Sequence, residues 1–276
     1  LGTRMMNDPL GLIAIFIGGT FFTVVVLRQV RAIRNRAARE ELSKEKLSVV
    51  EWETLGKKAR IVKYAPLEVR EKLEGIIEVL IAEKNFEACG GLEEVTDEMK
   101  LVVMAQAALL LVGREHDYFP LLKSVLFYPD AYQATGHDGE EQTRLGESWS
   151  SGSIILSWKS VVKGGEDPGD GRNVVLHEFS HQLDQENEAS SGVPILEERA
   201  DYQEWASAFG PAYDEFTARV DAGKRTVLDK YGATNPAEFF SVGTETFFEK
   251  GKQLRKRYPE LYAQMKEYYG LDPAEW

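Results

Sequence analysis

The chain has 276 residues, of which 43% are hydrophobic and 28% charged, a composition typical of globular proteins that excludes a disordered or fibrous chain. Its net charge is −12, but the first forty residues carry six arginines against two acidic residues and leave −16 on residues 41–276. Because a phosphate backbone requires a basic surface, this acidic body predicts no direct nucleic-acid binding. The single cysteine, Cys89, excludes an intramolecular disulfide and a cage of thiolate metal ligands.

An uncharged apolar run occupies residues 10–27, and an arginine-rich segment follows it directly. A run of this length lies at the lower edge of what spans a bilayer as a helix. The arginines on its carboxyl side predict a single-pass protein of the inner (cytoplasmic) membrane, with the following domain facing the cytoplasm. Two alternatives fit less well, since a cleaved signal peptide needs a basic leader and a buried helix would have to accommodate the glycines at 18–19. We therefore expect a transmembrane helix here, with the membrane as a partner.

The rest of the chain divides by charge and periodicity into two further parts. After the anchor and its basic flank, residues 1–36, a charged helical linker is expected over residues 37–60. Residues 61–276 then form one domain, without internal repeats or low-complexity tracts.

Within residues 61–276, helical and strand patterns are separated by glycine, proline and serine. Apolar residues at helical spacing, helix-capping residues and runs of β-branched and aromatic residues mark these elements. In chain order we expect a helix over 66–83, a helix capped by Thr96 and ending at Gly113, a strand over 124–129, a loop over 130–152, a strand over 153–162, a helix over 173–186 and mainly helix to the end. The predicted fold class is α+β, a small mixed sheet packed with helices.

The helix over 173–186 contains the motif HExxH as His177-Glu178-Phe179-Ser180-His181. Histidines four residues apart lie on one face of a helix, so both imidazoles can bind one metal ion while Glu178 reaches the neighbouring coordination position. Zinc held in this way lowers the pKa of its bound water, and Glu178 takes the proton as that water attacks a carbonyl. Two ordinary helix histidines are the alternative, but the chain has only four histidines, which makes a chance motif improbable.

A catalytic zinc site needs a third protein ligand, and carboxylates are the available candidates. Asn235 followed by Pro236 is typical of a helix start, and Glu238 and Glu245 lie seven residues apart on one face of that helix. Glu238 has an alternative role in a capping box with Asn235. Asp184, one turn beyond the motif, is a candidate for orienting a histidine, although a solvated surface position fits it equally well.

Several motifs in a fixed order resemble the Mlc titration factor A family of bacterial zinc peptidases, whose catalytic core is similar to that of anthrax lethal factor. The resemblance covers roughly residues 60–274 and does not extend to the apolar run. The segments that carry it are TDEMKLVVMAQAALLLVG, SVLFYP, GESWSSGSIILSW, HEFSHQLD, SGVPIL, YGATNPAEFFSVGTETFFE and RYPELYAQMKEYYGLDP. It implies a zincin-like metallopeptidase domain for residues 61–276.

By matching positions, the resemblance implies one Zn²⁺ per chain, bound by His177, His181 and Glu238, with Glu178 as the general base. It also implies a hydroxyl group beside the metal from Tyr231, seven residues before Glu238. A phenol in that position can donate a hydrogen bond to a developing oxyanion. Without the resemblance, an ordinary half-buried tyrosine before a glycine turn is the favoured interpretation of Tyr231.

These observations predict a zinc metallopeptidase of gluzincin-like type that acts on a peptide or protein substrate, with aminopeptidase action as one form. An exposed sheet edge commonly pairs with such a substrate, and residues 153–158 are a candidate for that edge, although a buried central strand is equally compatible. The resemblance also implies an alternative function, a zinc-stabilised regulatory protein that sequesters a transcriptional repressor and whose peptidase activity is weak or incidental.

Overall fold

The computed structural model describes residues 26, 29, 33–135, 141–144, 146–149, 152–187 and 191–276. The chain divides into two compact units, Leu1–Glu45 and Lys46–Trp276. In the first unit, residues 33–42 are helical. The second unit holds every strand and all the other helices of the described residues.

The second unit combines short strands with helices that carry most of its buried surface. The α-helices are α2 Val49–Lys58, α3 Arg60–Tyr64, α4 Leu67–Glu83, α5 Asp97–Leu109, α6 Trp158–Glu166, α7 Val174–Gln185, α8 Arg199–Asp221, α9 Pro236–Glu249, α10 Gly251–Arg257 and α11 Pro259–Tyr269. The strands are β1 Asn85–Ala88, β2 Ser124–Tyr128, β3 Tyr132–Thr135, β4 Glu141–Arg144, β5 Gly146–Trp149 and β6 Ser153–Ser157. Two short 3-10 helices, η2 Lys230–Ala233 and η3 Pro273–Glu275, complete it.

The main sheet has the strand order β1-β2-β6-β5. Strands β1, β2 and β6 run parallel, and β5 pairs with β6 in the antiparallel direction, with Gly146 opposite Leu156 and Trp149 opposite Ser153. Strands β3 and β4 form a separate antiparallel pair. The small mixed sheet packed with helices that the sequence predicts is therefore confirmed.

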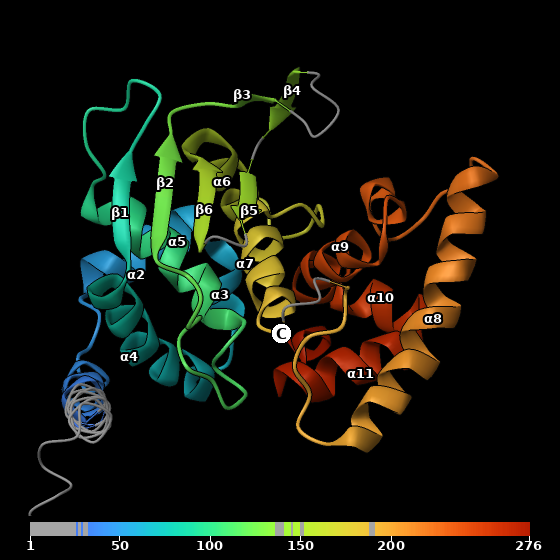
Figure 1. Cartoon of the computed structure of the whole chain (residues 1–276), viewed down its shortest axis with the longest axis horizontal. Coiled ribbons are helices and arrows are strands. Elements are labelled where there is room, and N and C mark those ends of the chain that lie inside the picture. The colour runs from blue at the N-terminus through green and yellow to red at the C-terminus, as the bar shows by residue number, and fades with distance from the viewer. Residues whose placement is uncertain are drawn as a thin grey trace, which may run out of the picture. The chain divides into compact units, whose positions relative to one another are not determined.

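Helix α7 lies between the sheet and the carboxyl-terminal helices, and this placement decides where the HExxH motif points (Figure 1). It packs against β5 and α5 on one side and against α9 on the other. Helix α5 is buried around its whole circumference, as expected for an apolar helix too short to span a membrane. Its Thr96 caps it as predicted, since the Thr96 side chain accepts a hydrogen bond from the Met99 amide.

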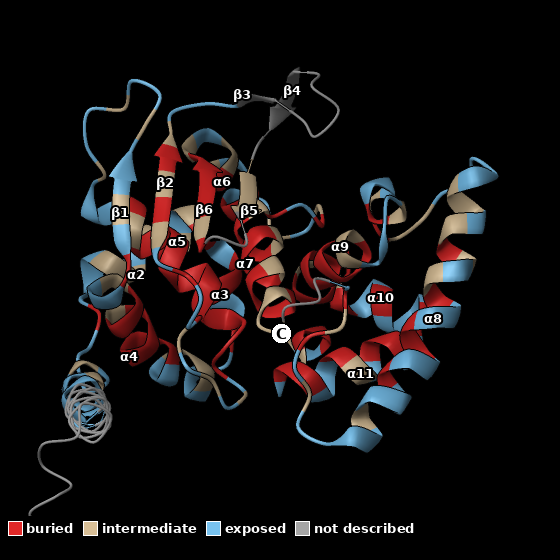
Figure 2. Cartoon of the chain, in the orientation of Figure 1, coloured by how far each residue is buried: buried red, intermediate tan, exposed pale blue. Residues whose placement is uncertain are grey.

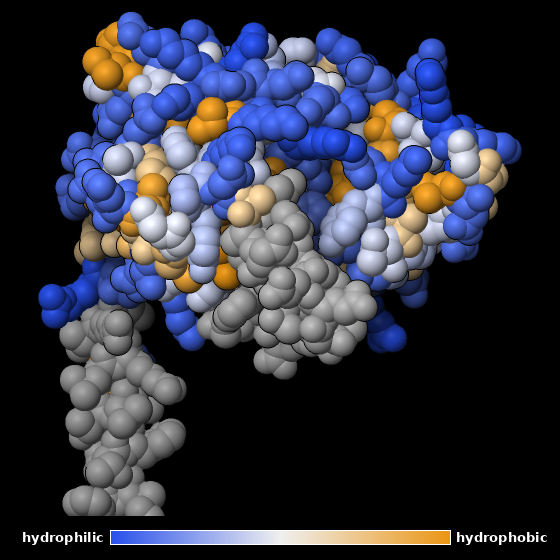
Figure 3. Space-filling model, turned by 90° about the horizontal axis from the view of Figure 1, so that it is seen from above, coloured by the Kyte–Doolittle hydropathy of each residue, from blue (hydrophilic) through white to orange (hydrophobic). Residues whose placement is uncertain are grey.

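Buried residues concentrate in β2, β6, α5, α7 and α9 (Figure 2). An aromatic cluster joins α8, α9 and α11, and in it Trp205 stacks on Phe209 at 3.9 Å and meets Phe240 at 5.8 Å between ring centroids. Such pairs contribute roughly 0.5–1.5 kcal/mol each beyond the area they bury. The cluster therefore fixes α9, the helix that carries Glu238 and Glu245. The surface seen in Figure 3 is mainly hydrophilic, with scattered hydrophobic residues.

Two predicted elements differ from the structure. The strand expected over 153–162 ends at Ser157, whose side chain accepts a hydrogen bond from the Ser160 amide and caps α6. Serine in this role competes with strand pairing, and the apolar residues that follow are equally suited to a short helix. The loop expected over 130–152 contains the short strands β3, β4 and β5, whose sequences have few of the residues typical of strands.

The predicted single-pass inner-membrane location is corrected by the structure. Within the part of the chain that the structure describes, no helix is both long enough and apolar enough to cross a membrane. The segment on which the prediction rested, residues 10–27, lies outside the described residues except for Val26.

Candidate metal centre

The HExxH motif lies on α7, whose start is fixed by Asn173. The Asn173 side chain accepts hydrogen bonds from the amides of Val175 and Leu176, which is the arrangement of an amino-terminal cap. The opposite face of the helix is anchored in the core by buried apolar residues, namely Val175, Leu176, Phe179 and Leu183. The two histidines consequently face α9, with their ring centroids 5.0 Å apart.

His177, His181 and Glu238 come together so that they could hold one metal ion. The Oε2 atom of Glu238 lies 3.1 Å from Nε2 of His177 and 3.4 Å from Nε2 of His181. In a tetrahedral zinc site with bonds of about 2.0–2.1 Å, ligand atoms are separated by about 3.3 Å. The chemistry of these three side chains and the two distances from Glu238 are therefore compatible with a zinc ion. Glu238 does not form the alternative capping box, since Asn235 caps α9 through the Glu238 amide and the carboxylate points to the histidines.

Helix α9 also orients both imidazole rings. Glu245 Oε1 lies 2.8 Å from Nδ1 of His177, and Ser241 Oγ lies 3.2 Å from Nδ1 of His181. In each ring the second nitrogen is therefore engaged, which leaves Nε2 directed at the shared site. Ser241 is itself held by the hydroxyl of Ser180, at 2.8 Å. Glu245, and not the Asp184 considered above, therefore contacts and orients a histidine of the motif.

Asp184 has a different role from the one considered for it. It is buried, and its carboxylate accepts hydrogen bonds from the amides of Gly192 and Val193 at 2.9 Å each. Gly192 has a φ of +76°, and a Cβ atom there would lie 2.3 Å from the carbonyl oxygen of Pro236. Asp184 thus fastens the loop after α7, and that loop packs closely on the start of α9 near Glu238.

Burial and neighbouring charged groups shift the pKa values of two carboxyl groups at the site, those of Glu238 and Glu178. Burial raises the pKa of Glu238, but its contacts with His177 and His181 outweigh burial and lower that pKa to about 2. Burial raises the pKa of Glu178, and the neighbouring carboxylates add to this effect against the opposing influence of the two histidines. Glu238 is therefore an anion suited to binding a cation, whereas the raised pKa of Glu178 makes its carboxylate a stronger proton acceptor than an ordinary glutamate.

Strand β5 approaches Glu178 so closely that a Cβ atom at position 146 would require neighbouring side chains to move. A Cβ atom at Gly146 would lie 2.6 Å from Oε1 and 2.8 Å from Cγ of Glu178, and 2.7 Å from Cγ2 of Val174. This contact was not anticipated, because nothing local in the sequence distinguishes Gly146 from the other glycines.

Gly146→Ala should lower the turnover number by about tenfold to a hundredfold while zinc content stays unchanged. The added methyl group displaces Glu178, the expected general base, whereas the three candidate ligands are untouched. Steady-state kinetics and elemental analysis of the purified variant measure the two quantities. Gly210→Ala is the matched control, because no atom lies within 4 Å of a Cβ at that position. Equal activity in the two variants would contradict the prediction.

Glu249, one turn beyond Glu245 on α9, is a second residue that the sequence did not single out. It accepts hydrogen bonds from the Asn173 side chain and from the Arg172 amide, both at 3.1 Å. Burial raises the pKa of Glu249 to about 8, and the nearby Glu245 carboxylate adds to this effect while Asn173 opposes it. Glu245 accepts the Asn173 amide at 2.5 Å, so α9 holds the start of α7 through two carboxylates.

A cavity of about 880 Å³ lies over these groups and is bordered by β5, α6, α7, η2 and α9. Among its lining residues are Glu178, Tyr231 and the three candidate ligands. The ring of Tyr231 lies 5.9 Å from the ring of His177, and its side chain is about half exposed. Among the described strands, β5 lies at the edge of the sheet beside this cavity and β6 is central, so of the two positions left open for residues 153–158 the central one is observed.

Comparison with known proteins agrees with this geometry. Residues 32–270 match the family model described as glucose-regulated metallo-peptidase M90. An uncharacterized protein of Synechocystis sp. is 42% identical over 225 residues, which cover 78% of this chain and 82% of that protein. Proteins named Mlc titration factor A are 30% identical in Yersinia pestis, over 74% of this chain and 78% of theirs, and 27% identical in Cronobacter sakazakii, over 75% and 80%.

Proposed function

We propose that this chain, which belongs to the glucose-regulated metallo-peptidase family M90, is a zinc-dependent peptidase with a zincin-like fold. In this proposal His177, His181 and Glu238 bind one zinc ion. The observation that carries it is the spacing of their three ligand atoms, combined with Glu178 lining the same cavity. Bound zinc would polarise the scissile carbonyl and lower the pKa of the attacking water.

The protein's own side chains then act on the substrate. Glu178 accepts the proton of the attacking water and returns it to the leaving amine. Tyr231 donates a hydrogen bond to the substrate oxygen that gains negative charge, which is the role its position beside His177 supports. Glu245 and Ser241 keep the imidazoles oriented throughout the reaction.

The position of strand β5 favours a peptide or protein as the substrate. It is the last strand in the order of the described sheet and borders the cavity, so an extended chain could pair with it, and main-chain pairing gives affinity that does not depend on one side chain. Such pairing would place successive substrate residues across the cavity next to Glu178.

The proposal predicts that chelation abolishes peptide hydrolysis and that zinc restores it. The purified chain should hold about one zinc per molecule by elemental analysis and should cleave members of a mixed peptide library. A chelator should remove both zinc and cleavage, and re-addition of zinc should restore both. Cleavage that persists in a chain proven to be without zinc would overturn the proposal.

A second candidate function is suggested by the name of the Mlc titration factor A relatives. We propose as this alternative that the chain binds a transcriptional repressor protein, with zinc stabilising the binding fold. A Glu178→Gln variant that binds purified Mlc as tightly as the unmodified chain, while the unmodified chain lacks peptidase activity, would favour the alternative. Hydrolysis without binding to Mlc would exclude it.

A further inference from the structure

Tyr231 lies on the 3-10 helix η2, which belongs neither to α7 nor to α9. The residue that caps this turn is Asp229, whose Oδ1 atom accepts a hydrogen bond from the Tyr231 amide at 3.0 Å. Thr234 closes the turn from the other side, because its hydroxyl donates to the Tyr231 carbonyl at 2.7 Å. The direction of the tyrosine side chain therefore depends on how Asp229 is held.

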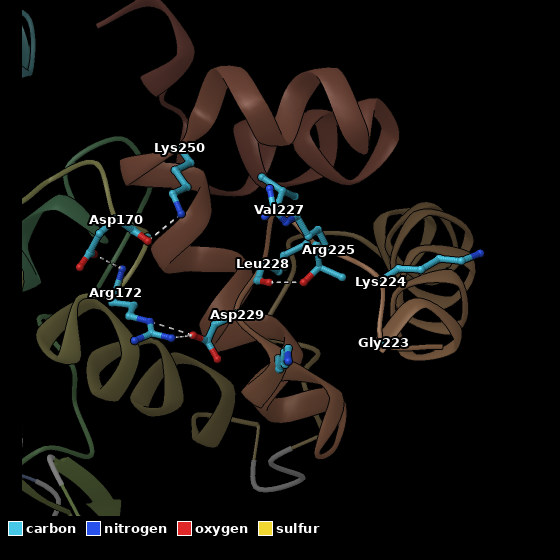
Figure 4. Close-up of a pocket in the computed structure, with 12 residues that line it drawn as sticks. Asp170, Arg172, Gly223, Lys224, Arg225, Val227, Leu228, Asp229 and Lys250 are labelled. Atoms are coloured by element: carbon cyan, nitrogen blue, oxygen red, sulfur yellow. Dashed lines mark hydrogen bonds and ion pairs between the residues drawn. The ribbon is translucent and has the colours of Figure 1, made fainter. Parts of the chain in front are cut away.

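Arg172 holds Asp229, as Figure 4 shows. Its Nε and Nη2 atoms lie 2.8 Å and 2.5 Å from Oδ2 of Asp229. Both contacts use the same oxygen, so Oδ1 stays available for the Tyr231 amide. Burial would raise the pKa of Asp229, but the Tyr231 amide and the guanidinium together lower it, which keeps the carboxylate charged.

The backbone of Arg172 is itself fixed to the zinc-binding framework. Its amide donates to Oδ1 of Asp170 at 2.8 Å and to Oε2 of Glu249 at 3.1 Å. Lys250 adds a hydrogen bond to the Asp170 carbonyl, at 2.6 Å. The next residue, Asn173, caps the helix that carries both histidines. The backbone of Arg172 is thus held at the start of α7 by contacts that include α9, and its guanidinium group reaches the cap of η2.

The Arg172–Asp229 ion pair is expected to contribute little to the stability of the folded protein. The Arg172 side chain is 71% exposed, and ion pairs at such positions contribute roughly 0–1 kcal/mol to folding. The pair also joins the turn of Tyr231 to the start of the HExxH helix. Arg172 and Asp229 also line both the cavity over the metal centre and a second pocket beside it.

We propose that Arg172 and Asp229 form a clamp that positions the Tyr231 hydroxyl over the metal centre. The clamp rests on the proposed function, because it acts by placing a hydrogen-bond donor for the substrate oxygen. Arg172 and Asp229 are positioning residues in this scheme and do not touch the reacting atoms.

Arg172→Gln should lower kcat about tenfold to a hundredfold, with KM and zinc content close to those of the unmodified chain. Asp229→Asn keeps an acceptor for the Tyr231 amide but loses the charge, so its effect should be smaller. Arg225→Gln is the matched control, because Arg225 lines the same second pocket and its side chain forms no ion pair within the described residues. In a Tyr231→Phe background, Arg172→Gln should cause no further loss. An equal loss in both backgrounds would overturn the clamp.

A measurement that does not depend on hydrolysis separates failure of the clamp from failure of the proposed function. With 3-fluorotyrosine at position 231 of the zinc-loaded protein, ¹⁹F NMR should give one sharp resonance that broadens or shifts in Arg172→Gln and not in Arg225→Gln. An unchanged resonance in Arg172→Gln would overturn the clamp even if the enzyme is active. A changed resonance in a chain without peptidase activity would retain the clamp and reject the proposed function.

Discussion

Glu178→Gln should abolish peptide hydrolysis while the protein keeps its zinc. The substitution retains the size and polarity of the side chain but removes the atom that accepts a proton, and loss of a general base typically costs about 10²–10⁴ in rate. Glu178 is not among the three candidate ligands, and its carboxylate lines the cavity at the contact with Gly146. Rates measured with saturating peptide and zinc content measured by elemental analysis test both parts of the prediction.

The control for Glu178→Gln is Glu166→Gln, an exposed position at the end of α6. It makes the same chemical change away from the cavity and should leave both rate and zinc content unchanged. Turnover by Glu178→Gln at the rate of this control would contradict the assignment of the general base. Loss of zinc from Glu178→Gln would instead mean that Glu178 is needed to hold the metal.

The arrangement of the candidate metal site could be predicted from the sequence because the information for it is local. A cap, an apolar face and two histidines four residues apart specify a helix and the side from which it binds a metal. The same reasoning places Asn235 as a cap and Glu238 and Glu245 on one face of α9, and the structure brings both carboxylates to His177. The choice between those two carboxylates required the family resemblance, since periodicity treats them equally.

The supporting residues could not be predicted because their partners are distant in the chain. Gly146 is needed only because β5 passes over Glu178, and Arg172 matters only because η2 lies within reach of its guanidinium. Strand β5 itself was missed, since four residues with little β-propensity form a strand by pairing with β6. Tertiary packing, which no local pattern encodes, decides all of these contacts.

Removing either carboxylate of α9 should weaken zinc binding, but Glu238→Ala should weaken it more than Glu245→Ala. Loss of a ligand removes a bond to the metal, whereas loss of a residue that orients a ligand typically costs 10–100-fold in affinity. Competition with a chromophoric chelator gives both dissociation constants. The reverse order would mean that Glu245 is the ligand and that Glu238 has only a supporting role.

In the zinc-free protein, Glu245→Ala should lower the thermal stability more than Glu238→Ala does. This order is the opposite of the order expected for zinc affinity, so it distinguishes the role of a ligand from that of a supporting residue. Glu245 accepts both the buried Asn173 amide and Nδ1 of His177, so Glu245→Ala leaves two groups of α7 without their partner. An unsatisfied buried donor costs about 1–3 kcal/mol. The Glu238 carboxylate contacts the ring nitrogens of both histidines at the cavity, where water can replace it. We therefore expect a lower Tm for zinc-free Glu245→Ala than for zinc-free Glu238→Ala, and equal Tm values would contradict the structural role assigned to Glu245.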